Sequence, residues 1–502
     1  MYTSLIGLST ELVVDILGYL PYQQIVRCRR VSKRLCIIID DTPALQRLIE
    51  LDAAGYESCS PPSTGVAVVL DSFRKIQRIY RNPNPKVTKV PLKHIPGLSS
   101  LHWWPHQVRT FSDIAIARIQ NDNRALGVLS LRSDVPEDNR FRLLKLSFDL
   151  NEYEAYPIEN LLVAWSWDKI YFLSLTDGSI HNKAVILTDG ELSPPEDIRD
   201  RPLLRVSVFR EWMLLCLGTF HSRDDAVYLI HWPSGKTMHK WDPHQKDEDV
   251  YFPGCIVQGH VFLPTKRGHS SRVDVYRIPE NSSTVDKIAH VAAYAFPNTL
   301  TTHWVDLNLE VAAAPVSGRT CRPVTSMLRM SFNSSPPMFI SLQALLSRIT
   351  SEESLERSPP PHTPIHVPWE AWGPNNTRVL DNIRYLAVFG RKVISEHAIL
   401  DFNPYDIARN VYAPAVAHGR SLRSTGSDYS GAIRTDPTSV PHYLGFEQTI
   451  TTRMPYRKTH LLLPNRNWIH GGSIIEEDGA VKLVRIATDS NNSPKHLEIF
   501  TL

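Results

Sequence analysis

The chain has 502 residues, with 55 lysines and arginines, 52 aspartates and glutamates, and a net charge of +3. This length exceeds what one hydrophobic core usually holds, so we expect one large domain and a smaller one, or three modest ones. Hydrophobic residues at 42% and charged residues at 21% are typical of folded globular chains. The small net charge argues against a general polyanion binder, because such proteins carry a large basic excess.

Cysteine usage and apolar runs narrow the class further. The six cysteines are scattered and form no C-x-x-C pair, which argues against a zinc cage or a dense disulfide framework. The N-terminus lacks the features of a secretory signal, and no apolar run approaches the roughly 20 residues that cross a bilayer. We therefore expect an intracellular protein, cytoplasmic or nuclear, with no metal, no cofactor and no membrane partner.

Helical spacing of apolar residues dominates the chain up to about residue 80. A first helix is predicted to begin at Ser9 or Thr10, either of which can cap it, and to end at Pro21. Its apolar positions recur at i, i+4, i+5 and i+8. They are Leu12, Ile16, Leu17 and Leu20.

A second helix is predicted to start near Gln23, with an apolar side and an arginine side. The apolar side consists of Ile25, Cys28, Val31, Ser32 and Leu35, and the arginine side of Arg27, Arg30 and Arg34. A third, short helix is predicted after Pro43. A longer helix is predicted from Val66 onward, until Pro83 stops it.

From about residue 100 the pattern changes to short apolar runs broken by Gly, Pro, Asn and Asp, which is typical of β-structure. Runs starting at residues 170, 227, 273 and 481 share one form, a strand followed by a polar turn. The first three start 57 and 46 residues apart, near the roughly 40–50 residues of a propeller blade. Two folds remain open: a β-propeller, or an unrepeated pair of β-sandwiches that reuses a common hairpin turn.

Two stretches of the β-rich part have the composition of flexible insertions. Residues 351–368 contain clustered prolines and charges, and residues 417–441 are polar and rich in serine and threonine. Neither offers enough apolar surface to offset the entropy cost of ordering. We therefore expect both to be insertions between strands.

The N-terminal segment resembles an F-box. That family has a leucine-proline-x-glutamate-leucine start, an isoleucine-leucine pair, a leucine-proline at the helix end and a valine-cysteine/serine-lysine/arginine stretch. The corresponding segments here are LSTEL, DIL, YLP and VSKRL. Ser9 replaces the usual proline and can itself cap a helix, and Leu35 stands where many members have tryptophan. The continuation after residue 50 is similar to a large fungal group of F-box proteins in which a β-rich, propeller-like region follows.

The resemblance implies a three-helix module that docks on the Skp adaptor of a Skp–cullin–F-box ubiquitin ligase, and through it on cullin. The matching positions that would contact the adaptor, some of them shared with the module's own core, are Leu8, Leu12, Ile16, Leu20, Pro21, Ile25, Val31 and Leu35. A segment this short cannot bury so many apolar side chains internally, so a partner's helix surface is the expected cover.

We therefore predict an α+β, multidomain chain. Residues 1–50 form the F-box, residues 51–100 a helical linker, and residues 101–502 a large all-β, propeller-like domain that recognises a protein substrate. The chain would be a non-catalytic, substrate-recognition subunit of the ligase. The alternatives are an F-box scaffold that acts outside any ligase, and an enzyme on a propeller scaffold, which would need converging carboxylates or histidines.

Motifs for other functions are incomplete. Five cations lie between residues 27 and 34, but they flank an apolar stripe that a phosphate-binding helix does not need. We favour a solvated helix surface that faces an acidic adaptor over a nucleic-acid site. The SGKT at 234–237 lacks the earlier glycine of a P-loop, and no G-x-S-x-G, H-E-x-x-H or G-x-G-x-x-G pattern is present. The sequence thus offers no catalytic or cofactor-binding residue.

Overall fold

The computed structural model covers the chain from residue 7 to residue 502, with gaps. The described residues are 7–59, 63–91, 103–111, 114–119, 122–131, 135–136, 139–166, 169–183, 203–218, 226–241, 249–251, 254–267, 270–279, 288–297, 308–311, 321–323, 327–331, 337–353, 364–380, 385–395, 397–408, 432–440, 449–461, 473–477, 480–488 and 494–502.

A helical module occupies the start of the described chain. Its helices are α1 (Thr10–Gly18), α2 (Tyr22–Cys28), α3 (Lys33–Asp41) and α4 (Pro43–Ala54), and α5 (Val66–Arg81) follows it. The predicted second helix is thus divided in two. Ser32 separates the halves, because its backbone is extended and its Oγ accepts a hydrogen bond from the backbone N of Leu35 at 3.1 Å. Within the described residues the predicted three-helix module therefore has four helical segments.

Helices α1 to α4 share one hydrophobic core. Its fully buried members are Val13, Leu17, Tyr22, Ile25, Leu35, Ile38, Ile39, Leu45, Ile49 and Ala53. Helix α4 ends at Gly55, whose left-handed φ of 73° is readily adopted only by glycine. The next strand, β1 (Tyr56–Ser58), pairs antiparallel with β20 (Cys321–Pro323). The chain is thus tied to a distant part of the sequence as soon as it leaves the module.

A large β-rich region of small sheets follows the helices. The first larger sheet contains β3 (Trp103–Phe111), β4 (Ile114–Ile119), β5 (Asp122–Ser130) and β6 (Phe141–Lys145). The second contains β7 (Glu152–Tyr156), β8 (Leu161–Trp165) and β9 (Ile170–Ser174). The third contains β10 (Leu203–Phe209), β11 (Trp212–Gly218), β12 (Ala226–His231) and β13 (Lys236–Trp241). The predicted strands near residues 170 and 227 are confirmed as β9 and β12.

The fourth sheet contains β14 (Asp249–Tyr251), β15 (Cys255–Val257), β16 (His260–Arg267), β17 (Ser270–Arg277), β18 (Ala289–Ala295) and β23 (Ile365–Val367). The fifth contains β19 (Asn308–Val311), β21 (Met327–Ser331), β22 (Met338–Ser341) and β24 (Thr377–Val379). The sixth sheet contains β25 (Tyr385–Phe389), β26 (Lys392–Ser395), β27 (Ala398–Asp401), β28 (Ala432–Arg434) and β31 (Tyr456–His460). The seventh contains β2 (Lys86–Pro91), β32 (Ser473–Glu477), β33 (Ala480–Thr488) and β34 (Pro494–Thr501). Strands β29 (Thr438–Val440) and β30 (Ile450–Thr452) form a separate ribbon.

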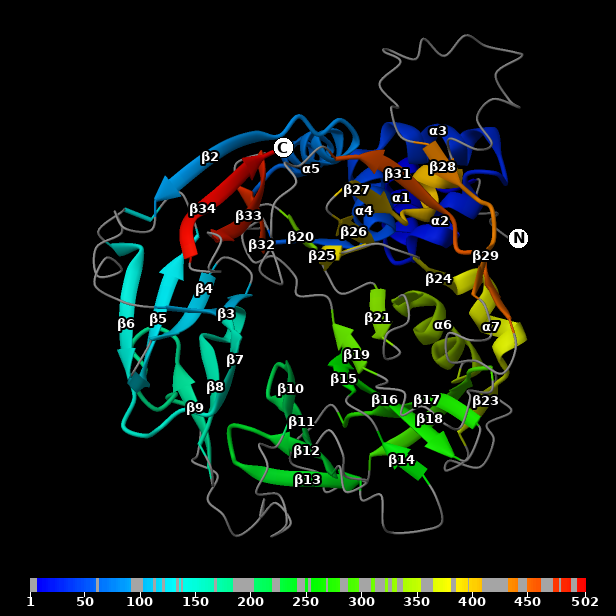
Figure 1. Ribbon diagram of the computed structural model, residues 1–502. Helices are drawn as coiled ribbons and strands as arrows, with labels where there is room; N and C mark the ends of the chain where they lie inside the picture. Colours follow the sequence, from blue (N-terminus) through cyan, green and yellow to red (C-terminus); the bar gives the residue numbers. More distant parts are fainter. Residues whose placement is uncertain are drawn as a thin grey trace.

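These sheets follow one another in chain order around a common centre (Figure 1). Each shares a buried cluster with the next, from the first and second sheets to the sixth and seventh. Strand β2, the first after α5, pairs antiparallel with β34, the last strand of the chain. The beginning and the end of the β-rich region therefore belong to one sheet.

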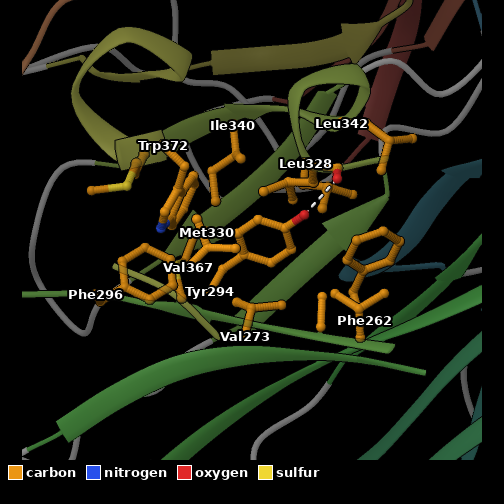
Figure 2. Close-up of a cluster of buried hydrophobic side chains, with 14 of the residues drawn as sticks. Phe262, Val273, Tyr294, Phe296, Leu328, Met330, Ile340, Leu342, Val367 and Trp372 are labelled. Carbon is orange, nitrogen blue, oxygen red and sulfur yellow. Dashed lines mark hydrogen bonds between the residues drawn. The ribbon is translucent and has the colours of Figure 1, made fainter. Parts of the chain in front are cut away.

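Two helices, α6 (Leu342–Glu353) and α7 (Trp369–Asn376), lie between β22 and β24 of the fifth sheet. With β23 they pack on the fourth sheet through the aromatic cluster of Figure 2. The Tyr294 hydroxyl donates to the carbonyl of Leu345 at 2.5 Å, and Trp372 Nε1 donates to the carbonyl of Ala295 at 3.0 Å. Because β23 pairs parallel with β18, this inserted segment also extends the fourth sheet by one strand.

The two predicted flexible insertions lie partly outside the described residues. Of residues 351–368, the stretch 354–363 is not described, and its flanks belong to α6 and β23. Of residues 417–441, the stretch 417–431 is not described, and β28 and β29 follow it. The expected flexibility of both therefore remains a prediction.

Candidate functional site

Helix α1 presents three large apolar side chains to solvent. Leu12, Ile16 and Tyr19 are 51%, 42% and 90% exposed. Their spacing of four and then three residues puts them on one face of the helix. The opposite face carries Val13 and Leu17, which are buried in the core of the module. We call the exposed set of Leu12, Ile16 and Tyr19 the α1 stripe.

The turn between α2 and α3 lies next to the segment that precedes α1. The Arg34 guanidinium, at the start of α3, donates to the backbone carbonyl of Leu8 at 2.6 Å. Val31, in this turn, is 70% exposed. The turn thus brings a further exposed apolar residue close to the N-terminal end of α1.

The eight adaptor contacts implied by the F-box resemblance fall into three groups. Leu12, Ile16, Pro21 and Val31 are exposed, and Leu8 and Leu20 are half-buried. Ile25 and Leu35 are 0% and 2% exposed, because they fill the core between the helices of the module. These two residues are therefore core residues and are not available to a partner in this structure.

Tyr19, the most exposed large apolar residue of the module, was missed by the sequence reasoning. Both Leu12–Val13 and Ile16–Leu17 are adjacent apolar pairs, so the pattern alone does not say which member of each pair faces inward. The signal for Tyr19 is its position, three residues after Ile16 and seven after Leu12.

The charges around these apolar residues are of both signs. Glu11 and Asp15 are exposed on α1. The pKa of the Glu11 carboxyl lies below its ordinary value, because its own backbone N–H and then the Ser9 hydroxyl form hydrogen bonds with it. Arg29 forms an ion pair with Asp40, with Nε 2.7 Å from Oδ1.

A buried lysine joins the helical module to the β-rich region. Lys392, the first residue of β26, is 0% exposed. Its Nζ lies 5.3 Å from the ring centre of Tyr56 and 5.2 Å from that of Tyr80, within the range of cation–π attraction. Asp401 Oδ2 lies 3.9 Å from the same Nζ. The side chain thus connects β1, α5 and the sixth sheet.

The two residues before Lys392 belong to the same joint. Gly390 has a φ of +50°, and a Cβ on it would lie 3.1 Å from the carbonyl oxygens of Ala54 and Gly55 at the end of α4. Arg391 is 7% exposed and donates to Oε1 of Gln343 in α6. Burial raises the pKa of Tyr22 in α2, and the nearby charge of Arg391 opposes that rise. The tip of the β25–β26 hairpin is therefore packed against the helical module.

An acid–base cluster occurs on two hairpin turns of the third sheet. His231 Nδ1 lies 2.8 Å from Ser234 Oγ, and His231 Nε2 lies 3.4 Å from Glu211 Oε2. Ser234 Oγ also accepts a hydrogen bond from the backbone N of Lys236 in its own turn, at 3.4 Å. These contacts hold the two turns together.

The described residues show neither a candidate metal centre nor a candidate membrane-spanning helix. Within the described ranges, no group of three or more His, Cys, Asp or Glu side chains is placed to hold a metal ion. None of the helices in that part of the chain has both the length and the apolar composition needed to span a membrane.

An F-box-like family model matches residues 10–49. The match confirms the F-box resemblance and covers α1, α2, α3 and part of α4. The described strands confirm that a large β-rich region with many small sheets follows it. No curated protein sequence matches the chain.

Several solved structures resemble the chain at low identity. Kluyveromyces lactis Hsv2 is 8% identical, with 77% of this chain and 94% of that chain covered and a TM-score of 0.34. Drosophila Semaphorin 1a, extracellular domains 1-2, is 9% identical, with 84% and 88% covered and a TM-score of 0.36. The WD40 domain of SCAP from fission yeast is 9% identical, with 89% and 97% covered and a TM-score of 0.28. Similarities this low carry no argument about fold or function.

Proposed function

Since the chain carries an F-box-like domain at residues 10–49, we propose that it binds a Skp-type adaptor through the α1 stripe and the α2–α3 turn. The single observation that carries this proposal is the exposure of Leu12, Ile16 and Tyr19 on one helix face of that domain. Complete burial of a large apolar side chain contributes about 1.5–3 kcal/mol, so covering two half-exposed side chains and the almost fully exposed Tyr19 is a substantial gain. Large apolar residues at the centre of an interface commonly dominate its affinity.

We further propose that the β-rich region is a propeller in which each of the seven larger sheets is a blade. Three features support this. The sheets follow in chain order around a centre (Figure 1), each packs on its neighbour, and β2 completes the sheet of β34. In a pair of sandwiches, by contrast, each sheet would pack on a single facing sheet.

In this proposal the propeller holds a protein substrate while the F-box holds the adaptor and, through it, cullin. The chain is then the substrate-recognition subunit of a Skp–cullin–F-box ubiquitin ligase. It contributes proximity, because it brings a substrate lysine near the ubiquitin-conjugating enzyme, and no bond-making group of its own.

The proposal is tested by comparing the partners of the intact chain with those of the double variant Leu12→Glu, Ile16→Glu. Each tagged full-length protein is purified from cells, and the co-purifying proteins are identified. We expect the adaptor and cullin to disappear from the variant while substrates remain, because the substituted residues are exposed and belong to the helical module, not to the β-rich region. Undiminished recovery of adaptor and cullin by the variant would overturn the proposal.

The same variant separates the ligase from the scaffold alternative. A substrate of the ligase should become longer-lived when adaptor binding is lost. If the half-life of every co-purifying partner is unchanged, the ligase function is wrong and the scaffold function remains.

A further inference from the structure

Three cations in and beside the α2–α3 turn have no counter-charge in the described part of the chain: one lies near the end of α2, one in the turn and one at the start of α3. Arg27, Arg30 and Lys33 are exposed. No ion pair or side-chain hydrogen bond within the described residues involves them, whereas the neighbouring Arg29 is bound to Asp40. We call Arg27, Arg30 and Lys33 the basic turn. They flank Val31 in the sequence, and Val31 is 70% exposed.

The surface beside this turn has the opposite charge. Glu11 and Asp15 are exposed on α1 and immediately precede Leu12 and Ile16 in the sequence. Hydrogen bonds from its own backbone N–H and from the Ser9 hydroxyl lower the pKa of the Glu11 carboxyl. The bond from Arg34 to the Leu8 carbonyl holds the basic turn near this end of α1. The exposed apolar residues of α1 therefore lie beside anions on their own helix, with the basic turn near the N-terminal end of that helix.

We propose that the basic turn binds an acidic segment of the same adaptor protein that covers the α1 stripe. This inference rests on the proposed function and adds the chemistry of the partner. A nucleic acid is a poorer occupant, because its uniform negative charge would meet Glu11 and Asp15 where it approached α1. A protein can carry acidic residues opposite the turn and different residues opposite α1.

The main effect of such a contact is on the rate of association. Exposed ion pairs add little to affinity, because water and salt screen them, but complementary charges steer two proteins together. The contribution of the basic turn should therefore be large at low salt and small at high salt.

The test is the association rate of the purified full-length chain with the purified Skp-type adaptor. The triple variant Arg27→Glu, Arg30→Glu, Lys33→Glu is compared with the wild type at about 50 mM and about 500 mM salt, where the screening length falls from about 14 Å to about 4 Å. We expect the variant to associate about tenfold or more slowly at low salt, and within about threefold of the wild type at high salt.

Two further variants serve as controls. The neutral set Arg27→Gln, Arg30→Gln, Lys33→Gln avoids an anion at the end of α2 and should give an intermediate rate. The matched control Lys75→Glu, Arg78→Glu, Lys86→Glu reverses three exposed cations on α5 and β2 and should leave the rate unchanged. Equal slowing by this control, or no slowing by the glutamate and glutamine variants, would overturn the inference.

Failure of the inference is distinguishable from failure of the proposed function. If the adaptor binds, is lost with Leu12→Glu, Ile16→Glu, and is insensitive to the basic turn, then only the charge contact is wrong. Binding of a labelled single-stranded or double-stranded oligonucleotide by the wild type, lost in the glutamate variant, would instead assign the turn to nucleic acid and overturn the inference.

Discussion

Lys392 and Tyr56 meet where the helical module joins the β-rich region, with the Nζ atom 5.3 Å from the ring centre. Tyr56 directly follows the cap of α4, and Lys392 directly follows the tip of the β25–β26 hairpin. Both are buried, at 3% and 0% exposure. A buried cation held by two rings and a carboxylate makes the module and the sixth sheet parts of one packed structure.

Reversal of this charge should therefore destabilise the chain. We expect Lys392→Glu to lower the free energy of unfolding by about 3–5 kcal/mol, because it puts a buried carboxylate beside Asp401 and against two ring faces. The measurement is chemical denaturation followed by tryptophan fluorescence. Lys75→Glu, on the exposed face of α5, is the control and should change the value by less than about 0.5 kcal/mol. Equal stability of the two variants would contradict the proposed role of Lys392.

Gly373 in α7 should not tolerate a methyl group. A Cβ at this position would lie 2.1 Å from Cε3 of Trp369, so either the ring or the helix must move. We expect Gly373→Ala to cost about 1–3 kcal/mol in thermal unfolding, the usual range for overpacking. Gly18→Ala, where nothing lies within 4 Å of the added atom, should be neutral or slightly stabilising. A neutral Gly373→Ala would show that the Trp369 ring does not lie against Gly373 of the same helix in this way.

The carboxyl of Asp274 should make a contribution to the stability of the fold that depends on pH. Burial raises the pKa of this carboxyl, but the bond and charge of His290 and the charge of Arg272 outweigh it, so the pKa lies below 3.8. A depressed carboxyl pKa stabilises the fold above the unfolded-state pKa of about 3.8, and the effect is lost as the pH falls through the folded-state value.

The variant Asp274→Asn should accordingly be less stable than the wild type by about 1–3 kcal/mol at pH 7, and the difference should shrink as the pH falls through the folded-state pKa. Denaturation at a series of pH values measures this. Asp149→Asn breaks an exposed pair with Arg124 (3.0 Å), which water and salt screen, and should change the stability much less than Asp274→Asn does. A pH-independent difference between wild type and Asp274→Asn would refute the electrostatic explanation.

Ser32 should stabilise the fold by capping the N-terminus of α3. Its Oγ accepts the Leu35 N–H at 3.1 Å, so Ser32→Ala should lose about 1 kcal/mol of unfolding free energy. Ser32→Asp supplies another capping oxygen and should retain most of it. If alanine and aspartate are equally destabilising, the loss has another cause than the cap.

The sequence predicts those elements that local signals specify. Pro21, Pro43 and Pro83 mark helix boundaries that the structure confirms, and the runs at residues 170 and 227 became strands. Ser32 is a local signal for a helix start, but the apolar spacing continues across it. The sequence therefore predicted one helix where the structure has α2 and α3. Helical spacing alone did not show whether Leu12 or Val13 faces inward, because both are apolar and the core that decides it is built from α2, α3 and α4. The F-box resemblance, not the spacing, assigned Leu12 to the adaptor.

Contacts between segments far apart in the chain could not be predicted from the sequence, for a different reason. The pairing of Tyr56 with Pro323 joins segments with no shared local pattern. Lys392 is a charged residue in a polar-looking turn, and its burial depends on rings contributed by two distant segments. The candidate site was predictable as a region, whereas its exposed face and the joint that holds it required the fold.

The central claim is that the α1 stripe binds a Skp-type adaptor, and the affinity of the purified full-length chain for that adaptor tests it most directly. Titration calorimetry should give a dissociation constant that rises about 100-fold or more for Leu12→Glu, Ile16→Glu, because two apolar contacts become buried charges. Val68→Glu substitutes an apolar residue that is 59% exposed on α5 and should leave the constant within about twofold. An unchanged constant for the double variant, or an equal loss with Val68→Glu, would contradict the claim.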